Sequence, residues 1–229
     1  MSRTYRHELK FFCSEAELQR IENKIKHICS RAPYVGPEGV YRIRSMYFDT
    51  YDSRCYRENE AGVDDRAKYR VRIYDTSDSV IKLELKGSFR DRKYKECCSI
   101  TREQCEQMIQ EKPVKNVLQH QNVLQEFLVE RQLELLKPQV IVEYMRTPYV
   151  YPVGNVRITF DRFITSSSSR EFFEEKIPGR GIMPEHMHLL EVKYDKILPA
   201  AIVEVLNSSA CLSRTSFSKY ALCRAYGLK

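Results

Sequence analysis

The sequence of 229 residues has no tryptophan, no long apolar run and no cysteine pair with the spacing of a metal site. Its apolar runs, such as 140–142 and 189–190, are far too short to span a bilayer. The eight cysteines lie at positions 13, 29, 55, 97, 98, 105, 211 and 223. None forms a CxxC pair, so we expect free thiols and no zinc. The start of the sequence lacks the apolar core of a signal peptide, and we expect a cytoplasmic protein.

Familiar catalytic signatures are missing as well. The sequence contains no Walker A loop and no GxGxxG, HExxH or GxSxG pattern, and its five histidines show no catalytic pairing. The net charge of +7 and the 15 tyrosines raise the question of nucleic acid. Because no RRM-type signature or recognition-helix motif accompanies them, nucleic acid is not the expected partner. The placement of the basic residues is therefore more informative than their number.

Hydrophobic periodicity predicts a chain dominated by strands. Strands are expected at 5–12, 42–49, 66–74, 79–87, 92–101, 139–149, 155–163 and 189–194. Capping boxes at Ser14 and Thr101 predict helices to about residues 30 and 111. A short helix or turn is expected at 52–60, and further helices once or twice between Pro113 and Pro138 and at 200–206 and 213–228. The segment 166–186 is expected to be a lid or a disordered loop. Without a repeat or a clear boundary, residues 1–229 are expected to form one domain.

Charged side chains recur at alternate positions along most of these strands. A solvated face explains any one such strand. Together with their apolar opposite faces and several amphipathic helices, they predict an α+β fold: a closed antiparallel β-barrel with a basic lumen and helices packed outside. The side chains expected in the lumen are Arg6, Glu8, Lys10, Lys68, Arg70, Arg72, Lys82, Glu84, Lys86, Lys93, Lys95, Arg146, Arg157, Glu191 and Lys193.

Basic residues outnumber acidic ones in that set. Crowding like charges in a partly desolvated cavity is unfavourable by roughly several kcal/mol for each unpaired ion, so a bound polyanion is expected to supply the missing charge. Phosphate chains suit this role, because arginine binds their oxygens bidentately and lysine acts as a point charge. The few glutamates would pair with lysines or hold Mg²⁺ or Mn²⁺ through oxygen ligands.

Several short segments resemble, in order, the VTC (vacuolar transporter chaperone) domain. They are 5–10 (YRHELK), 45–50 (SMYFDT), 68–74 (KYRVRIY), 83–86 (LELK), 140–149, 156–161 (VRITFD), 190–194 (LEVKY) and 217–220 (FSKY). These segments span nearly the whole chain. The VTC family is a branch of the triphosphate tunnel metalloenzymes, whose fold is a tunnel-shaped antiparallel barrel, and it is known for making inorganic polyphosphate from ATP.

The resemblance implies a metal-dependent phosphotransferase that moves the γ-phosphate of ATP to polyphosphate. The residues that it implies grip the phosphate chain are Lys10, Arg70, Arg72, Lys86, Arg146, Arg157 and Lys219. Lys68, Lys95 and Lys193 are expected to add phosphate contacts from the lumen. Glu191 is implied to be the ligand of Mn²⁺ or Mg²⁺. A membrane-embedded partner protein, which would hold the chain at the membrane periphery, is a further implication.

Two positions bear on the activity. Hydrolase and cyclase relatives begin with an ExExK strand, whereas this strand reads Arg6-x-Glu8-x-Lys10, which favours the polymerase branch. Many relatives carry a basic residue near Asn59, and Arg57 is a candidate substitute here. Two alternatives stay open: hydrolysis of tripolyphosphate or a nucleoside triphosphate, and a non-catalytic polyphosphate-binding module.

Overall fold

The computed structural model describes residues 5–90, 92–209 and 212–227. The strands in this part of the chain are β1 (His7–Ser14), β2 (Ser30–Arg31), β3 (Tyr41–Asp49), β4 (Arg66–Tyr74), β5 (Ser77–Phe89), β6 (Arg92–Ser99), β7 (Lys137–Tyr151), β8 (Val156–Ser167), β9 (Arg180–Gly181), β10 (Met187–Tyr194) and β11 (Ser213–Arg214). The helices are α1 (Glu15–Ile28), α2 (Arg54–Glu60), α3 (Arg102–Ile109), α4 (Asn122–Glu134), α5 (Ala200–Asn207) and α6 (Lys219–Gly227), with a 3₁₀ turn η1 (Val153–Asn155).

Local signals in the sequence place the first and third helices. The Ser14 hydroxyl accepts the backbone N–H of Glu17, whose carboxylate accepts the N–H of Ser14 in return. Thr101 and Gln104 form the same reciprocal pair at the start of α3. Each pair satisfies backbone donors that the first turn of a helix leaves free, which confirms both capping boxes.

The last helix begins later than the predicted residue 213. Residues 213 and 214 instead pair with β1 as β11, and the N–H of Thr215 donates to the carbonyl of Lys10 at 2.9 Å. The hydroxyl of Ser218 then accepts the backbone N–H of Ala221, so that α6 begins at Lys219. The pairing with β1 therefore overrides the helical periodicity of this segment.

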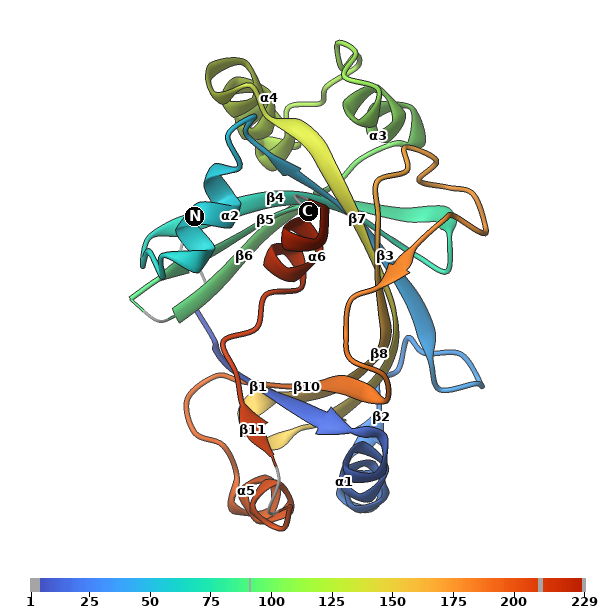
Figure 1. The fold of residues 1–229 in the computed structure, drawn as a ribbon, viewed down its shortest axis with the longest axis vertical. Coiled ribbons are helices and arrows are strands. Elements are labelled where there is room, and N and C mark those ends of the chain that lie inside the picture. Colours follow the sequence, from blue (N-terminus) through green and yellow to red (C-terminus); the bar gives the residue numbers. More distant parts are fainter. Residues whose placement is uncertain (1–4, 91, 210–211, 228–229) are drawn as a thin grey trace.

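All the strands belong to one antiparallel sheet that curls around the molecule (Figure 1). Its order is β11-β1-β10-β8-β7-β3-β4-β5-β6, with β2 and β9 paired beside β7 and β8. The prediction of a closed barrel is wrong, because within the described ranges β6 meets the start of the chain only at an isolated bridge between Arg6 and Lys93. The edge of β1 beyond that bridge is occupied by β11, which pairs with Phe11 and Phe12.

Helices α1, α3, α4 and α5 lie outside this curled sheet, whereas α6 lies inside it and α2 contributes Cys55 and Asn59 to the lining of the inner cavity. On one side, α1 and α5 cover a core that includes Leu18 and Phe160; on another, α3 and α4 cover a core that includes Leu83 and Phe127. Figure 1 shows α6 inside the curl, so the prediction that helices pack outside is wrong for α6, and α2 does not follow it fully either. Its Tyr220 joins an apolar cluster on the concave face, where the strands carry residues such as Val142 in place of charges.

The segment between β8 and β10 is a structured loop and not a disordered one, with Phe172 in one core and Ile182 in the apolar cluster of the concave face. Arg44 on β3 is fully buried and donates to the carbonyl oxygens of Phe172 and Glu174. Phe172 itself is buried in the core beneath α3 and α4. These contacts anchor the loop, because the guanidinium of Arg44 would otherwise be buried with Glu143 as its remaining partner.

Two expectations from the composition concern the cysteines and the apolar segments. Seven cysteines lie within the described residues and all are free, as expected, whereas Cys211 lies outside these residues. No helix in the described ranges has both the length and the apolar character required to cross a membrane.

Candidate active site

The charged part of the concave face encloses a cavity of about 680 Å³, a size typical of small-molecule sites. Its basic lining residues are Lys10, Arg66, Lys68, Arg70, Arg72, Lys86, Lys93, Arg146, Lys193, Arg214 and Lys219. Glu8 and Glu191 are the carboxylates in the lining. Most of these side chains come from strands, while Lys219 comes from the first turn of α6.

Strand register brings these residues together. Lys10 lies opposite Glu191, and Glu8 lies opposite Lys193, across the pair β1–β10. Across β4–β5, Lys68 lies opposite Lys86 in the same way. Because directly opposed residues of antiparallel strands project to the same face, each pair sends two charged groups into the curl.

Eight of the ten residues predicted to hold phosphate line the cavity, and Glu191 lies among them. Arg157 does not: it is exposed at the start of β8, although its position in the strand gives it the expected face. Lys95 lies on the edge strand β6 with its side chain 51% exposed, outside the cavity, and its ammonium contacts Glu84 at 3.2 Å. Arg6, Lys82 and Glu84, also predicted to be lumenal, are not part of its lining either. Strand alternation gives the face of a residue but not its enclosure, which decreases at strand ends and sheet edges.

Arg70 and Arg72 are held by groups behind them. Arg70 donates to Glu84 at 2.7 Å and to the hydroxyl of Tyr47 at 2.8 Å. Arg72 donates to the hydroxyls of Ser45 and Tyr144. Burial acts to raise the pKa of Glu84, but Arg70 and Arg72 lower it well below its ordinary value. The carboxylate therefore stays ionised and orients the Arg70 guanidinium.

A second network joins β7, β8, β10 and α6. Asp161 is fully buried and accepts two hydrogen bonds from Arg146, both at 2.7 Å. The ammonium of Lys219 lies 2.7 Å from Asp161 and 2.6 Å from Glu191. Arg146 also reaches Glu191 at 3.3 Å. Two acids thus hold two of the predicted phosphate-binding residues in place.

Asp161 is the functional candidate that sequence reasoning missed. It lies inside the segment 156–161 that resembles the VTC domain, but Arg157 is the residue of this strand that was predicted to face the lumen. Arg214 was missed for another reason, since the two-residue strand β11 has no periodicity to detect.

Asn59 and Arg57 have different environments. Asn59 lines the cavity, whereas Arg57 is exposed and forms an ion pair with Asp52 outside it. Arg57 therefore does not replace the basic residue that was expected near Asn59.

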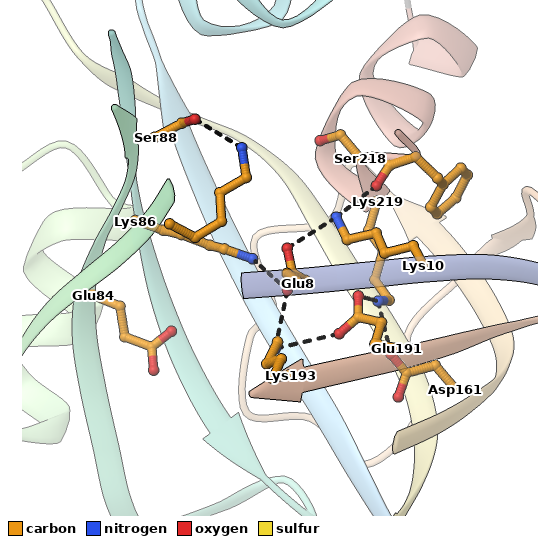
Figure 2. A network of polar contacts seen from close by, with 12 residues as sticks. Glu8, Lys10, Glu84, Lys86, Ser88, Asp161, Glu191, Lys193, Ser218 and Lys219 are labelled. Atoms are coloured by element: carbon orange, nitrogen blue, oxygen red, sulfur yellow. Dashed lines mark hydrogen bonds and ion pairs between the residues drawn. The ribbon is translucent and has the colours of Figure 1, made fainter. Parts of the chain in front are cut away.

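The three lysines around Glu8 lie farther from its carboxylate than Lys219 lies from Asp161 and Glu191. Glu8 has ammonium groups of Lys10, Lys86 and Lys193 at 3.4, 3.6 and 3.2 Å (Figure 2). Although Glu8 acts to raise the pKa of Lys86, burial and the neighbouring lysines lower it well below its ordinary value. This part of the cavity contains more positive charge than its carboxylates neutralise.

The donor set suits a divalent metal only together with phosphate oxygens. No group of three potential ligands from His, Cys, Asp and Glu occurs in residues 5–90, 92–209 and 212–227. Opposite Glu191, the buried hydroxyl of Thr159 makes no hydrogen bond within the same ranges, which leaves an oxygen donor next to this carboxylate. Mg²⁺ is commonly bound by one or two carboxylates plus substrate phosphates, and this set of residues fits that pattern.

Comparison with solved structures shows a shared fold. An adenylate cyclase candidate from Bacillus halodurans aligns with a TM-score of 0.53 and 12% identity, over 91% of this chain and 89% of its own. An adenylyl cyclase candidate from Hippeastrum, described as having a dominant triphosphatase activity, gives a TM-score of 0.52 and 13% identity over 96% of both chains. The PH1819 protein of Pyrococcus horikoshii OT3 gives 0.51 and 14%, over 97% of this chain and 99% of its own.

At such low identities these similarities establish the fold alone. None of the curated proteins matches the sequence. The VTC domain model, in contrast, matches residues 5–227, which include every residue of the cavity. The chain therefore belongs to the VTC domain family.

Proposed function

We propose that this protein transfers the γ-phosphate of ATP to a growing chain of inorganic polyphosphate. Membership of the VTC family supports an activity that involves polyphosphate or triphosphate. The observation that carries the proposal is the cavity itself, in which basic side chains from seven strands and α6 surround only two lining carboxylates. A chain of phosphates is the ligand that best matches such a surface.

The cavity residues would act by binding and alignment. Arg70 and Arg146, oriented by Glu84 and Asp161, present N–H groups to phosphate oxygens, and the lysines neutralise the remaining charge. A terminal oxygen of the acceptor attacks the γ-phosphorus in line, and the bond to the β–γ bridging oxygen breaks, with its electron pair leaving on ADP. The acceptor is already an anion, so no general base is required. A divalent metal held by Glu191 would neutralise charge on the phosphate oxygens.

Hydrolysis is the main alternative. In that case water takes the place of the phosphate acceptor, and tripolyphosphate or a nucleoside triphosphate is cleaved. Binding of polyphosphate without turnover is the second alternative. A cytoplasmic location and a membrane-embedded partner protein remain part of the proposal.

The purified protein is expected to convert ATP, with Mn²⁺ or Mg²⁺, into a ladder of polyphosphates on a gel. Lys86→Met should weaken the ladder, because it removes a cavity ammonium, whereas Lys26→Met on the outer helix α1 should leave it unchanged. Phosphate release without a ladder would reassign the protein as a triphosphatase. Tight polyphosphate binding without turnover in either metal would favour the binding module.

Binding of polyphosphate is also expected to take up a proton at Lys68. Burial and the nearby Lys10 lower the pKa of Lys68 to about 7, and its ammonium contacts the hydroxyl of Ser218 at 3.1 Å. Lys68 is thus largely neutral above that pH, and a phosphate anion would restore its charge. Affinity should therefore increase as the pH falls from about 9 to 7, by up to about tenfold for each pH unit.

Titration calorimetry in buffers of different ionisation enthalpy measures this proton uptake directly. Lys68→Met serves as the control, because it removes the titrating group while the phosphates of the ligand still titrate. An equal proton uptake in both proteins would contradict the assignment to Lys68.

A further inference from the structure

Glu8 differs from the other buried carboxylates that contact the basic residues of the cavity. Glu84, Asp161 and Glu191 each form at least one contact of 2.7 Å or less with a basic group. Glu8 is just as enclosed, with its side chain 4% exposed, but its ammonium contacts are 3.2 Å or longer. Its Oε1 makes no hydrogen bond with any residue of the described ranges.

The surroundings of Glu8 resemble those that a phosphate group would need. Three lysines approach it from three different strands: Lys10 from β1, Lys193 from β10 and Lys86 from β5 (Figure 2). These three line the cavity and belong to the set predicted to hold phosphate. In a set of buried lysines, one loosely bound carboxylate reduces their mutual repulsion without satisfying all of their donors.

We propose that Glu8 is an internal counter-anion, which neutralises these three lysines in the absence of substrate and loses them to the incoming polyphosphate chain. This inference rests on the proposed function, because it requires polyphosphate to enter this cavity. Glu8 would lower the affinity for phosphate chains, since part of each binding event replaces an existing ion pair. It would also hold the three lysines in place around the cavity before substrate arrives.

Glu8→Gln gives a direct test, with inorganic tripolyphosphate as the probe and a chelator present to remove divalent metals. The amide keeps the size of the side chain and removes its charge. Calorimetry should show about tenfold tighter binding than in the unmodified protein, because close charge pairs at interfaces couple by at least this factor. The rise in Tm that tripolyphosphate causes should also be larger in the variant, whose lysines lack their counter-anion.

Glu84→Gln is the matched control. It removes the same charge from a buried carboxylate behind the cavity lining, but Glu84 orients Arg70 at 2.7 Å, so binding should weaken. Equal tightening in both variants would mean a general electrostatic effect and overturn the specific role of Glu8. Unchanged metal-free binding in Glu8→Gln, with a loss only when Mn²⁺ is present, would overturn it in favour of a metal ligand.

Folding is checked by circular dichroism before binding is compared. If Glu8→Gln does not fold, Glu8→Asp provides the test, because its shorter carboxylate moves away from the lysines and should give intermediate tightening. The proposed function fails separately, and earlier, if the unmodified protein does not bind tripolyphosphate at all.

Discussion

Replacing Asp161 with asparagine is expected to lower the free energy of unfolding by about 3–5 kcal/mol, the range typical of breaking a buried ion pair. Asp161 has no exposed surface, and its carboxylate contacts both Arg146 and Lys219 at 2.7 Å. The asparagine variant would bury these two cations with Glu191 as their remaining counter-charge. Chemical denaturation at pH 7 measures the difference.

The pH dependence gives a second readout for the same residue. Burial acts to raise the pKa of Asp161, but Arg146 and Lys219 lower it below its ordinary value. A carboxylate with a depressed folded-state pKa contributes stability that is present above its unfolded pKa of about 4 and is lost as the pH falls through the folded value. The variant should therefore lose less stability on acidification than the unmodified protein.

Asp195→Asn is the matched control for Asp161→Asn. Asp195 also pairs with an arginine, Arg6 at 2.8 Å, but on the surface, where solvent screens the interaction. We expect little change in stability from this variant. Similar losses in the two variants would show that enclosure of the Arg146 network is not what stabilises it.

Replacing Glu191 with glutamine is expected to reduce turnover of ATP by at least about 100-fold, the effect of losing electrostatic stabilisation by a bound metal. Glu191 lies at the centre of the cavity network, with Lys219 at 2.6 Å and Lys193 at 3.4 Å. Metal-free binding of tripolyphosphate should persist, because the basic residues remain. Gel analysis of the products and calorimetry with and without Mn²⁺ separate the two effects.

A purely structural role for Glu191 predicts a different pattern. Burial acts to raise the pKa of this carboxyl group, but Lys219 and Lys193 lower it well below its ordinary value, so it carries a charge that stabilises the fold. If the variant lost metal-free binding and stability together with turnover, its role would be to organise Lys219. Tm measured with and without tripolyphosphate makes this distinction.

Local chemistry explains what could be predicted. The alternation of charge along 66–74 correctly placed Lys68, Arg70 and Arg72 on one face, because successive side chains of a strand point to opposite sides. The capping boxes at Ser14 and Thr101 were confirmed for an equally local reason. Both predictions rest on interactions between residues that are near one another in the sequence.

Enclosure could not be predicted in this way. Arg157 and Lys95 have the same alternation as the cavity residues, yet both lie outside: Arg157 is exposed at a strand end, and the half-exposed Lys95 contacts Glu84 while Lys93 of the same edge strand lines the cavity. The two residues of β11, which occupy the edge of β1 beyond its single bridge to β6, have no periodicity that could predict them. The position of α6 inside the curl depends on the apolar part of the concave face, contributed by distant strands.

The sequence by itself determined the class of the fold, the basic character of its inner face and the family of the protein. Only the tertiary structure decided which charges meet. Asp161 and Lys219 are far apart in the chain, and their contact arises because α6 enters the curl of the sheet. Whether a charge is solvated, paired or left for a ligand depends on distances between separate strands, and no pattern within a single strand contains that information.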